Sequence, residues 1–238
     1  MKRPAICSLI LILIMSGCTK RQAATPLPTP KAYGAQIVEV SGGKQIAGVG
    51  SKLSDPLVVQ VNGADGNPVA GALVSFRCAG LAFNPPDALS DSSGQVSTVV
   101  QLAGIPGSYQ VLAATPKSGG GAATVISREI ALGYQEKLGK EVSEKYCTVC
   151  HDPESTPERV SKFDNLTPPA PHQFTDGNTL NPMSDGDLIK IIADGGPALG
   201  KSPQTPAYRN TLTTAEIKAL VAYLRAVADP PYPGAAGK

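Results

Sequence analysis

The chain has 238 residues and no tryptophan, and its 21 Lys and Arg residues against 19 Asp and Glu residues give a formal net charge of +2. A charge this small, without a basic stripe interleaved with aromatic side chains, predicts neither nucleic-acid binding nor another strongly electrostatic partner. The length suits two ordinary domains.

The chain opens with a segment typical of export. Two positive residues precede an apolar run from Ala5 to about Met15, which is too short to span a bilayer. Its end, MSGC, resembles the lipobox of bacterial lipoproteins. The resemblance implies that residues 1–17 are a signal peptide and that Cys18 carries lipid, which would anchor the folded domains in the bacterial cell envelope, on the periplasmic side or at the cell surface. A plain signal peptide with a chance cysteine is the alternative.

After Cys18, residues 19–35 form a polar segment, TKRQAATPLPTPKAYGA, that contains three prolines, and we take residues 18–35 together. Such a composition cannot bury a core and favours semi-extended backbone. We predict a flexible tether that lifts the folded part off the membrane.

Residues 36–132 are all-β in character, with short alternating runs separated by turn residues. GADGNP supplies Gly, Asp and Asn for a tight reversal between two of these runs. Alternation predicts that one face of each strand points inward, and the inward set comprises Leu57, Val59, Val61, Val74, Phe76, Cys78, Tyr109, Val111 and Ala113. Six or seven short strands at this spacing predict a β-sandwich.

The stretches VNGADGNPVAGALVSF, SDSSGQVSTVV and GSYQVLAAT resemble the bacterial immunoglobulin-like repeats of the intimin and invasin type. The resemblance implies an immunoglobulin-like sandwich that acts as a spacer or an adhesion module, and the fold alone assigns no activity. Cys78 has no obvious partner, so we expect it to be a buried small apolar residue. Pairing with another chain is the alternative.

Residues 147–151 read CTVCH, and the whole chain holds two histidines. A structural zinc site needs four ligands. His172 could join Cys147, Cys150 and His151, so a crowded zinc site stays open. A redox-active dithiol would follow a strand within a βαβ frame and has no use for the adjacent histidine.

Covalent haem attachment gives every position of this motif a use. The preceding GYQEKLGKEVSEKY has a helical pattern, and thiols three residues apart on a helical turn share one face. They can reach both vinyl groups of one porphyrin, and the next histidine can turn towards the iron. We therefore predict one haem c, bound covalently by Cys147 and Cys150, with His151 as an axial ligand.

The flanks resemble class I cytochromes c. GKEVSEKYCTVCHD resembles the amino-terminal helix and haem site of that family, and TTAEIKALVAYLRAVAD resembles the carboxy-terminal helix. The resemblance implies an all-α class I cytochrome c domain over residues 133–229. We predict a disordered tail at 230–238. It also implies that Gly139 on the first helix lets Tyr223 on the last helix approach closely.

Two helices carry explicit start signals. Thr213 and Glu216 form a capping-box pair, and Ser184 is the predicted N-cap of an earlier helix that Gly195 ends. The predicted inward residues are Leu188, Ile191 and Ile192 on the earlier helix and Ile217, Leu220, Val221 and Leu224 on the last one.

The loop FDNLTPPAPHQFTDG resembles the proline-bearing loop on the proximal side of the haem in that family. There a carbonyl usually accepts the hydrogen bond of the axial histidine and fixes its tautomer. The resemblance implies that Pro168 or Pro169 supports His151.

The sixth iron ligand is where the chain departs from the family. The usual methionine falls in a pattern that reads GKSPQTPAYRNTLT here, with Thr205 at the methionine position. A neutral hydroxyl is a poor iron ligand. Met183 as a displaced ligand, His172 or Lys201 in its place, and a vacant or water-occupied site all stay open.

Three functions are compatible with these features. The first is a lipid-anchored electron carrier that exchanges single electrons with a redox protein partner in the envelope, because no catalytic triad, second cofactor motif or paired catalytic carboxylates occur. The second is a haem-based sensor or small-ligand binder with an open iron site. The third is a surface adhesion or assembly protein with an accessory haem domain. We expect the electron carrier, which is not itself an enzyme but could serve as a subunit of an oxidoreductase complex.

Overall fold

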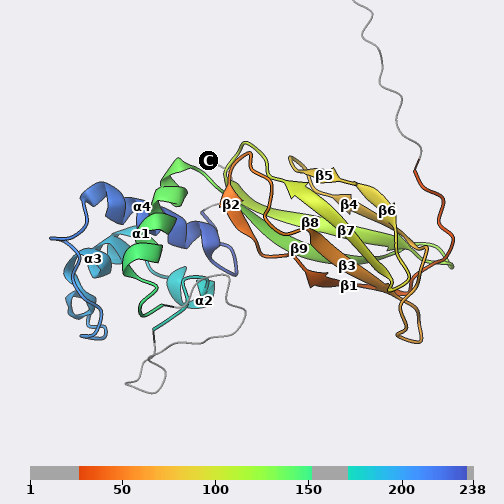
Figure 1. The fold of residues 1–238 in the computed structure, drawn as a ribbon. Coiled ribbons are helices and arrows are strands. Elements are labelled where there is room, and N and C mark those ends of the chain that lie inside the picture. Colours follow the sequence, from red (N-terminus) through yellow and green to blue (C-terminus); the bar gives the residue numbers. More distant parts are fainter. Residues whose placement is uncertain (1–26, 152–170, 235–238) are drawn as a thin grey trace, which may run out of the picture.

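A computed structural model describes residues 27–151 and 171–234. It contains a β-sandwich followed along the chain by a helical domain, and the two abut at the end of the sandwich where β2 and β9 lie (Figure 1). This order confirms the fold class expected from the sequence. None of the helices within the described ranges is long and apolar enough to cross a bilayer.

The sandwich has nine strands within the described residues: β1 (Gln36–Ser41), β2 (Ile46–Gly48), β3 (Leu57–Asn62), β4 (Leu73–Arg77), β5 (Ala82–Asn84), β6 (Asp87–Leu89), β7 (Gln95–Gln101), β8 (Gly107–Pro116) and β9 (Ala122–Leu132). One sheet has the order β1-β3-β7-β5 and the other β2-β9-β8-β4-β6. Strands adjacent in a sheet are mostly not consecutive in the chain, which is the crossed connection pattern of immunoglobulin-like sandwiches.

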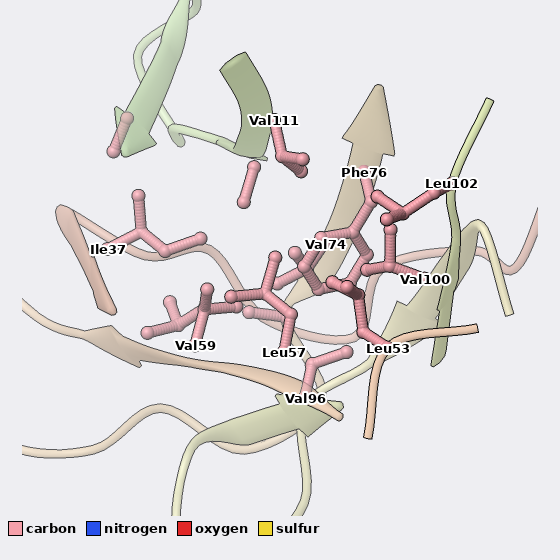
Figure 2. Packing of buried hydrophobic residues seen from close by; sticks show 14 of the residues in the cluster. Ile37, Leu53, Leu57, Val59, Val74, Phe76, Val96, Val100, Leu102 and Val111 are labelled. Atoms are coloured by element: carbon pink, nitrogen blue, oxygen red, sulfur yellow. The ribbon is translucent and has the colours of Figure 1, made fainter. Parts of the chain in front are cut away.

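The sandwich core comes from the predicted alternation. In β3, Leu57, Val59 and Val61 are fully buried, while the residues between them are partly exposed. Figure 2 shows Leu57 and Val59 meeting Val74 and Phe76 from the opposite sheet. Burying each such side chain stabilises the fold by about 1.5–3 kcal/mol.

The turn between β3 and β4 also forms as expected. The Gly63 N–H donates to the Asn67 carbonyl at 2.8 Å, and Gly66 has a φ of 80°, a left-handed conformation that favours glycine. Asp65 Oδ1 accepts from the Asn67 N–H at 3.1 Å. These contacts fix the register of the strands on either side.

Cys78 differs from the expectation of a fully buried residue. It lies just beyond the end of β4, packs against the core while remaining partly exposed, and lines a shallow pocket with Leu81 and Phe83. Its position past the last residue of β4 accompanies this partial exposure. Burial still raises the pKa of the Cys78 thiol.

The helical domain consists of α1 (Tyr134–Tyr146), α2 (Gly177–Leu180), α3 (Asp185–Asp194), the 3₁₀-helix η1 (Gly196–Leu199) and α4 (Thr214–Val227). The predicted capping box of α4 and the predicted N-cap of α3 are both present, and the N-cap of α3 is also part of a capping box. Ser184 caps α3 with Asp187, and Thr213 caps α4 with Glu216. The predicted stripe of α4 is buried throughout, whereas on α3 only Leu188 is buried fully and its two predicted isoleucine partners are partly exposed.

The α1–α4 crossing depends on a missing side chain. A Cβ atom on Gly139 would lie 2.0 Å from the Ala219 carbonyl oxygen and 2.7 Å from Tyr223 Cβ. Only glycine permits so close an approach of the two helices. The predicted pairing of Gly139 with Tyr223 is therefore confirmed.

The core of the helical domain extends onto the last strand of the sandwich, which the sequence did not indicate. Strand β9 runs almost directly into α1, and Ile130 and Leu132 at its end belong to the apolar cluster that includes Leu224 and Val227 of α4. The end of β9 thus packs into the sandwich core on one face and into the core of the helical domain on the other.

Candidate functional site

The CTVCH motif continues the last turn of α1. The Cys147 N–H donates to the Ser143 carbonyl at 2.8 Å, and the His151 N–H donates to the Cys147 carbonyl at 2.9 Å. This helical bonding keeps Cys147, Cys150 and His151 on one compact turn. Cys147 is buried, Cys150 and His151 are half-buried, and Val149 is 60 % exposed, so the turn lies at the surface of the domain.

His151 is oriented by the segment after the undescribed loop. Its Nδ1 lies 2.5 Å from the His172 carbonyl oxygen. A carbonyl can only accept, so Nδ1 carries the proton and the lone pair of this tautomer is on Nε2. The Phe174 ring stacks on the imidazole, with centroids 4.4 Å apart. The imidazole is therefore set in the tautomer that a metal ligand needs.

The predicted supporters Pro168 and Pro169 lie outside the described residues, as does Cys18. Within the described part, the carbonyl that faces His151 belongs to His172. The His172 ring lies beside Asp176, with its Nδ1 3.4 Å from Asp176 Oδ2. Among the residues described, no group of three or more His, Cys, Asp or Glu side chains is arranged to hold a metal ion.

Tyr208 is a neighbour of the motif that the sequence did not single out. Its hydroxyl donates to the Tyr146 carbonyl at 3.1 Å, and the two rings meet edge to face at 6.1 Å. Burial raises the pKa of the Tyr208 phenol, and the nearby Cys147 and Cys150 raise it further. Tyr208 lies within the stretch GKSPQTPAYRNTLT, so the sequence could have drawn attention to it, but its contact with α1 is visible only in the fold.

Thr205 is held in a loop folded onto the glycine pair after α3. Its carbonyl accepts from the Gly196 N–H at 3.1 Å, and a Cβ on Gly196 would lie 1.9 Å from the Ser202 carbonyl oxygen. Close backbone contacts with Gly196 thus fix the conformation of the loop that contains Ser202 and Thr205. Lys201 in the same loop is exposed.

Met183 is half-buried and fixed through its backbone to α4. Arg225 donates to the Met183 carbonyl at 2.5 Å, to the Leu180 carbonyl at 2.8 Å and to Asp185 Oδ1 at 2.9 Å. The Arg225 side chain is only 8 % exposed. These contacts tie the segment between α2 and α3 to the last turns of α4. Whether the Met183 sulfur ligates iron stays a prediction.

The residues present fit a covalently attached haem. Two cysteines and a histidine stand on one turn, and the histidine is in the tautomer with its lone pair on Nε2. Cys147 and Cys150 would hold the porphyrin by thioether bonds, and His151 would ligate the iron. These assignments remain predictions from the motif.

Residues 136–228 match the family model for cytochrome c. No curated protein matches the chain.

Several solved structures resemble the sandwich region at low similarity. The D00-D0 domain structure of intimin is 16 % identical with a TM-score of 0.29, covering 44 % of this chain and 50 % of its own. The D0-D1 structure of intimin is 17 % identical with a TM-score of 0.33, covering 43 % of this chain and 49 % of its own. The Yersinia pseudotuberculosis adhesin InvE is 9 % identical with a TM-score of 0.29, covering 42 % of this chain and 32 % of its own. This chain thus spans half or less of each of these structures.

The family match covers α1 from its third residue, the CTVCH turn and all of α4. The chain therefore carries a cytochrome c domain at residues 136–228, and such a domain implies a covalently bound haem.

Proposed function

We propose that this chain is a lipid-anchored monohaem cytochrome c that passes single electrons between redox proteins in the bacterial cell envelope. The observation that carries the proposal is the CTVCH turn within a cytochrome c domain, with the Nδ1–H of His151 donating to the His172 carbonyl. The export signal and Cys18 support the location.

The haem, when bound, supplies an iron that changes by one electron between its ferric and ferrous states. The protein's own residues set the reduction potential of this change. The hydrogen bond from His151 to His172 increases the electron donation of the imidazole, which stabilises the ferric state and lowers the reduction potential. Phe174, 8 % exposed, covers one face of the imidazole and excludes water from it.

Exposure of the attachment turn supports contact with a partner. Val149 between the two cysteines is 60 % exposed, and Cys150 is half-buried. A haem attached here would have its thioether edge near the surface, where a second redox protein can approach it. No bond needs to be made or broken in the partner, so the absence of acid–base machinery in the described residues is no obstacle.

The proposal is tested on the purified full-length protein. We expect haem that stays with the chain in a denaturing gel, and a reversible one-electron reduction in spectroelectrochemistry. Cys147→Ala with Cys150→Ala should abolish the covalent haem, whereas Cys78→Ala, the matched cysteine control in the sandwich, should keep it. A haem stain that survives in the double variant, or a haem that cannot be reoxidised, would refute the proposal.

The lipid anchor has its own test. Wild-type protein expressed in bacteria should incorporate labelled fatty acid and sediment with membranes, and Cys18→Ser should do neither. Wild-type protein that is uncleaved, or soluble after cleavage elsewhere, would overturn the lipid anchor and leave the redox role untouched.

Thr205 at the usual methionine position supports a second candidate, a haem protein that binds small ligands. The visible spectrum separates the two. A low-spin ferric form that resists carbon monoxide when reduced supports electron transfer, whereas a high-spin form that binds carbon monoxide readily supports the ligand binder.

A further inference from the structure

Arg128 reaches from the sandwich to the end of α4. It lies on the outer face of β9, between the buried side chains of Ser127 and Glu129. Its Nε donates to Ser108 Oγ at 2.8 Å, and its Nη2 donates to the Ala228 carbonyl at 2.8 Å. Its side chain is 18 % exposed. One guanidinium therefore joins two strands of the sandwich to the carboxyl end of a helix in the other domain.

The electrostatics of this contact are favourable. The last carbonyls of a helix lack intrahelical donors and carry the negative end of the helix dipole. Arg128 supplies both a donor and a positive charge there, and its Nη1 lies 3.8 Å from the Asp229 carboxylate. A hydrogen bond from a charged donor at a partly buried site contributes more than a neutral one.

Asp229 in turn forms backbone hydrogen bonds with the segment that follows His172. Its N–H donates to the Thr175 carbonyl at 2.8 Å, and its carbonyl accepts from the Gly177 N–H at 3.1 Å. The next carbonyl, of Pro230, accepts from Asn181 Nδ2 at 2.9 Å. We name residues 228–230 the C-terminal strap, because they bind the segment just before and within α2.

The fit of the C-terminal strap is close. A Cβ on Gly177 would lie 2.4 Å from the Pro230 carbonyl oxygen, so this position needs glycine. Farther along, the Tyr232 ring lies 4.0 Å from the Arg225 guanidinium carbon. We predicted a disordered tail at residues 230–238, whereas Pro230 and Tyr232 make these contacts and residues 235–238 lie outside the described part.

The segment bound by the C-terminal strap is the one that positions His151. Phe174, which stacks on the imidazole, directly precedes Thr175. The His172 carbonyl, which accepts from His151 Nδ1, is three residues before Thr175. The contacts therefore run without a gap from Arg128 through Asp229 and Thr175 to the surroundings of the axial histidine.

We propose that Arg128 is a positioning residue through which the immunoglobulin-like domain fixes the His151 side of the haem and so sets its reduction potential. This rests on the proposed function. Loss of the guanidinium would loosen Ala228 and Asp229, lengthen the hydrogen bond to His172, and weaken electron donation by the imidazole. The ferric state would lose stabilisation, so the reduction potential would rise.

The test uses full-length, haem-loaded protein with Arg128→Met, which keeps the apolar stem but removes the donors. Ile130 and Leu132 still join the two domains, so the variant should fold. The matched control is Arg77→Met, which removes a guanidinium bound to Asp87 within the sandwich. Reduction potential is measured by spectroelectrochemistry, and amide hydrogen exchange is measured at Asp229 and Gly177.

Arg128→Met should raise the reduction potential and speed exchange at both amides about tenfold, while Arg77→Met changes neither. Arg128→Lys retains one charged donor, so its reduction potential and exchange rates should fall between those of wild type and Arg128→Met. If Arg128→Met fails to fold, Arg128→Lys provides the test. A wild-type potential and wild-type exchange in a folded Arg128 variant would overturn the proposal. That result would leave the redox function standing, whereas wild-type protein without covalent haem would refute the redox function itself.

Discussion

The sandwich and the helical domain bury their cores by different routes. In the sandwich, alternate residues of each strand meet across two sheets, and the fully buried Val59, Val61 and Phe76 need nothing else to complete the core. In the helical domain, the two long helices meet through the space left by Gly139, and the ligand turn lies at the edge. The sandwich core is therefore formed by sandwich residues alone, whereas the residues of the haem site are positioned by loops and by the C-terminal strap.

Phe76→Ala should have the largest effect on stability and should reveal whether the sandwich is independent of the haem. The ring is fully buried, so its loss should cost about 3–5 kcal/mol of sandwich stability. Urea unfolding followed by hydrogen exchange in β3 measures this cost. Val99→Ala, at a position 39 % exposed, is the control and should cost little. A haem spectrum altered in the folded Phe76 variant would contradict the separation of the two cores.

Gly139→Ala applies the same test to the helical domain. The added Cβ would lie 2.0 Å from the Ala219 carbonyl oxygen, so the helices must separate, at a cost of about 3 kcal/mol. Gly186→Ala on α3 is the matched control, because its nearest atom would be 3.6 Å away. The melting temperature, followed by haem absorbance, should fall for Gly139→Ala and should stay within a few degrees of wild type for Gly186→Ala. Equal melting temperatures for the two variants would disprove the close crossing of α1 and α4.

Glu129→Gln should sharpen the comparison through pH. Glu129 is fully buried on the inner face of β9, and its pKa is raised from 4.5 to about 8, mainly by burial and to a lesser extent by the nearby Glu39. Because the folded state holds this proton to higher pH than the unfolded state, its stabilisation is complete below about pH 4.5 and is lost as pH rises to about 8. Glu129→Gln should therefore be more stable than wild type near pH 8 and nearly equal to it near pH 4.

This pH dependence should be measured as urea midpoints across that range. Glu141→Gln, at an exposed position on α1, is the control and should keep the wild-type slope. The Gln45 N–H donates to Glu129 Oε2 at 2.9 Å, and a glutamine can still accept it. A Glu129→Gln profile parallel to that of wild type would show that Glu129 does not hold the proton.

Met183→Leu should have the smallest effect. The Met183 backbone is tied to Arg225 beside the start of α3, and we expect the sixth position to be open or weakly ligated instead. The visible and near-infrared spectra should then match wild type, while Thr205→Met should create a low-spin form. Loss of a near-infrared sulfur-to-iron band in Met183→Leu would instead identify Met183 as the ligand. A low-spin wild-type spectrum unchanged by Met183→Leu would direct attention to His172 or Lys201.

The sequence by itself determined the elements whose signals are local. Alternation in β3, the turn after Asn62, the caps at Ser184 and Thr213 and the CTVCH motif all lie within short windows, because a strand face, a cap or a helical turn is decided by near neighbours. The Gly139–Tyr223 crossing was also accessible, but only through resemblance to a family.

The tertiary structure alone decided which distant backbone groups meet. The carbonyl that faces His151 belongs to His172, twenty-one positions along the chain, and a backbone carbonyl carries no signature of residue type. The same holds for Tyr208 against the Tyr146 carbonyl, and for Arg128 against the Ala228 carbonyl, one hundred positions away. Periodicity reports which side of an element is buried but not which loop covers it. For this reason the haem motif could be read from five letters, whereas the contacts that position its histidine required the fold.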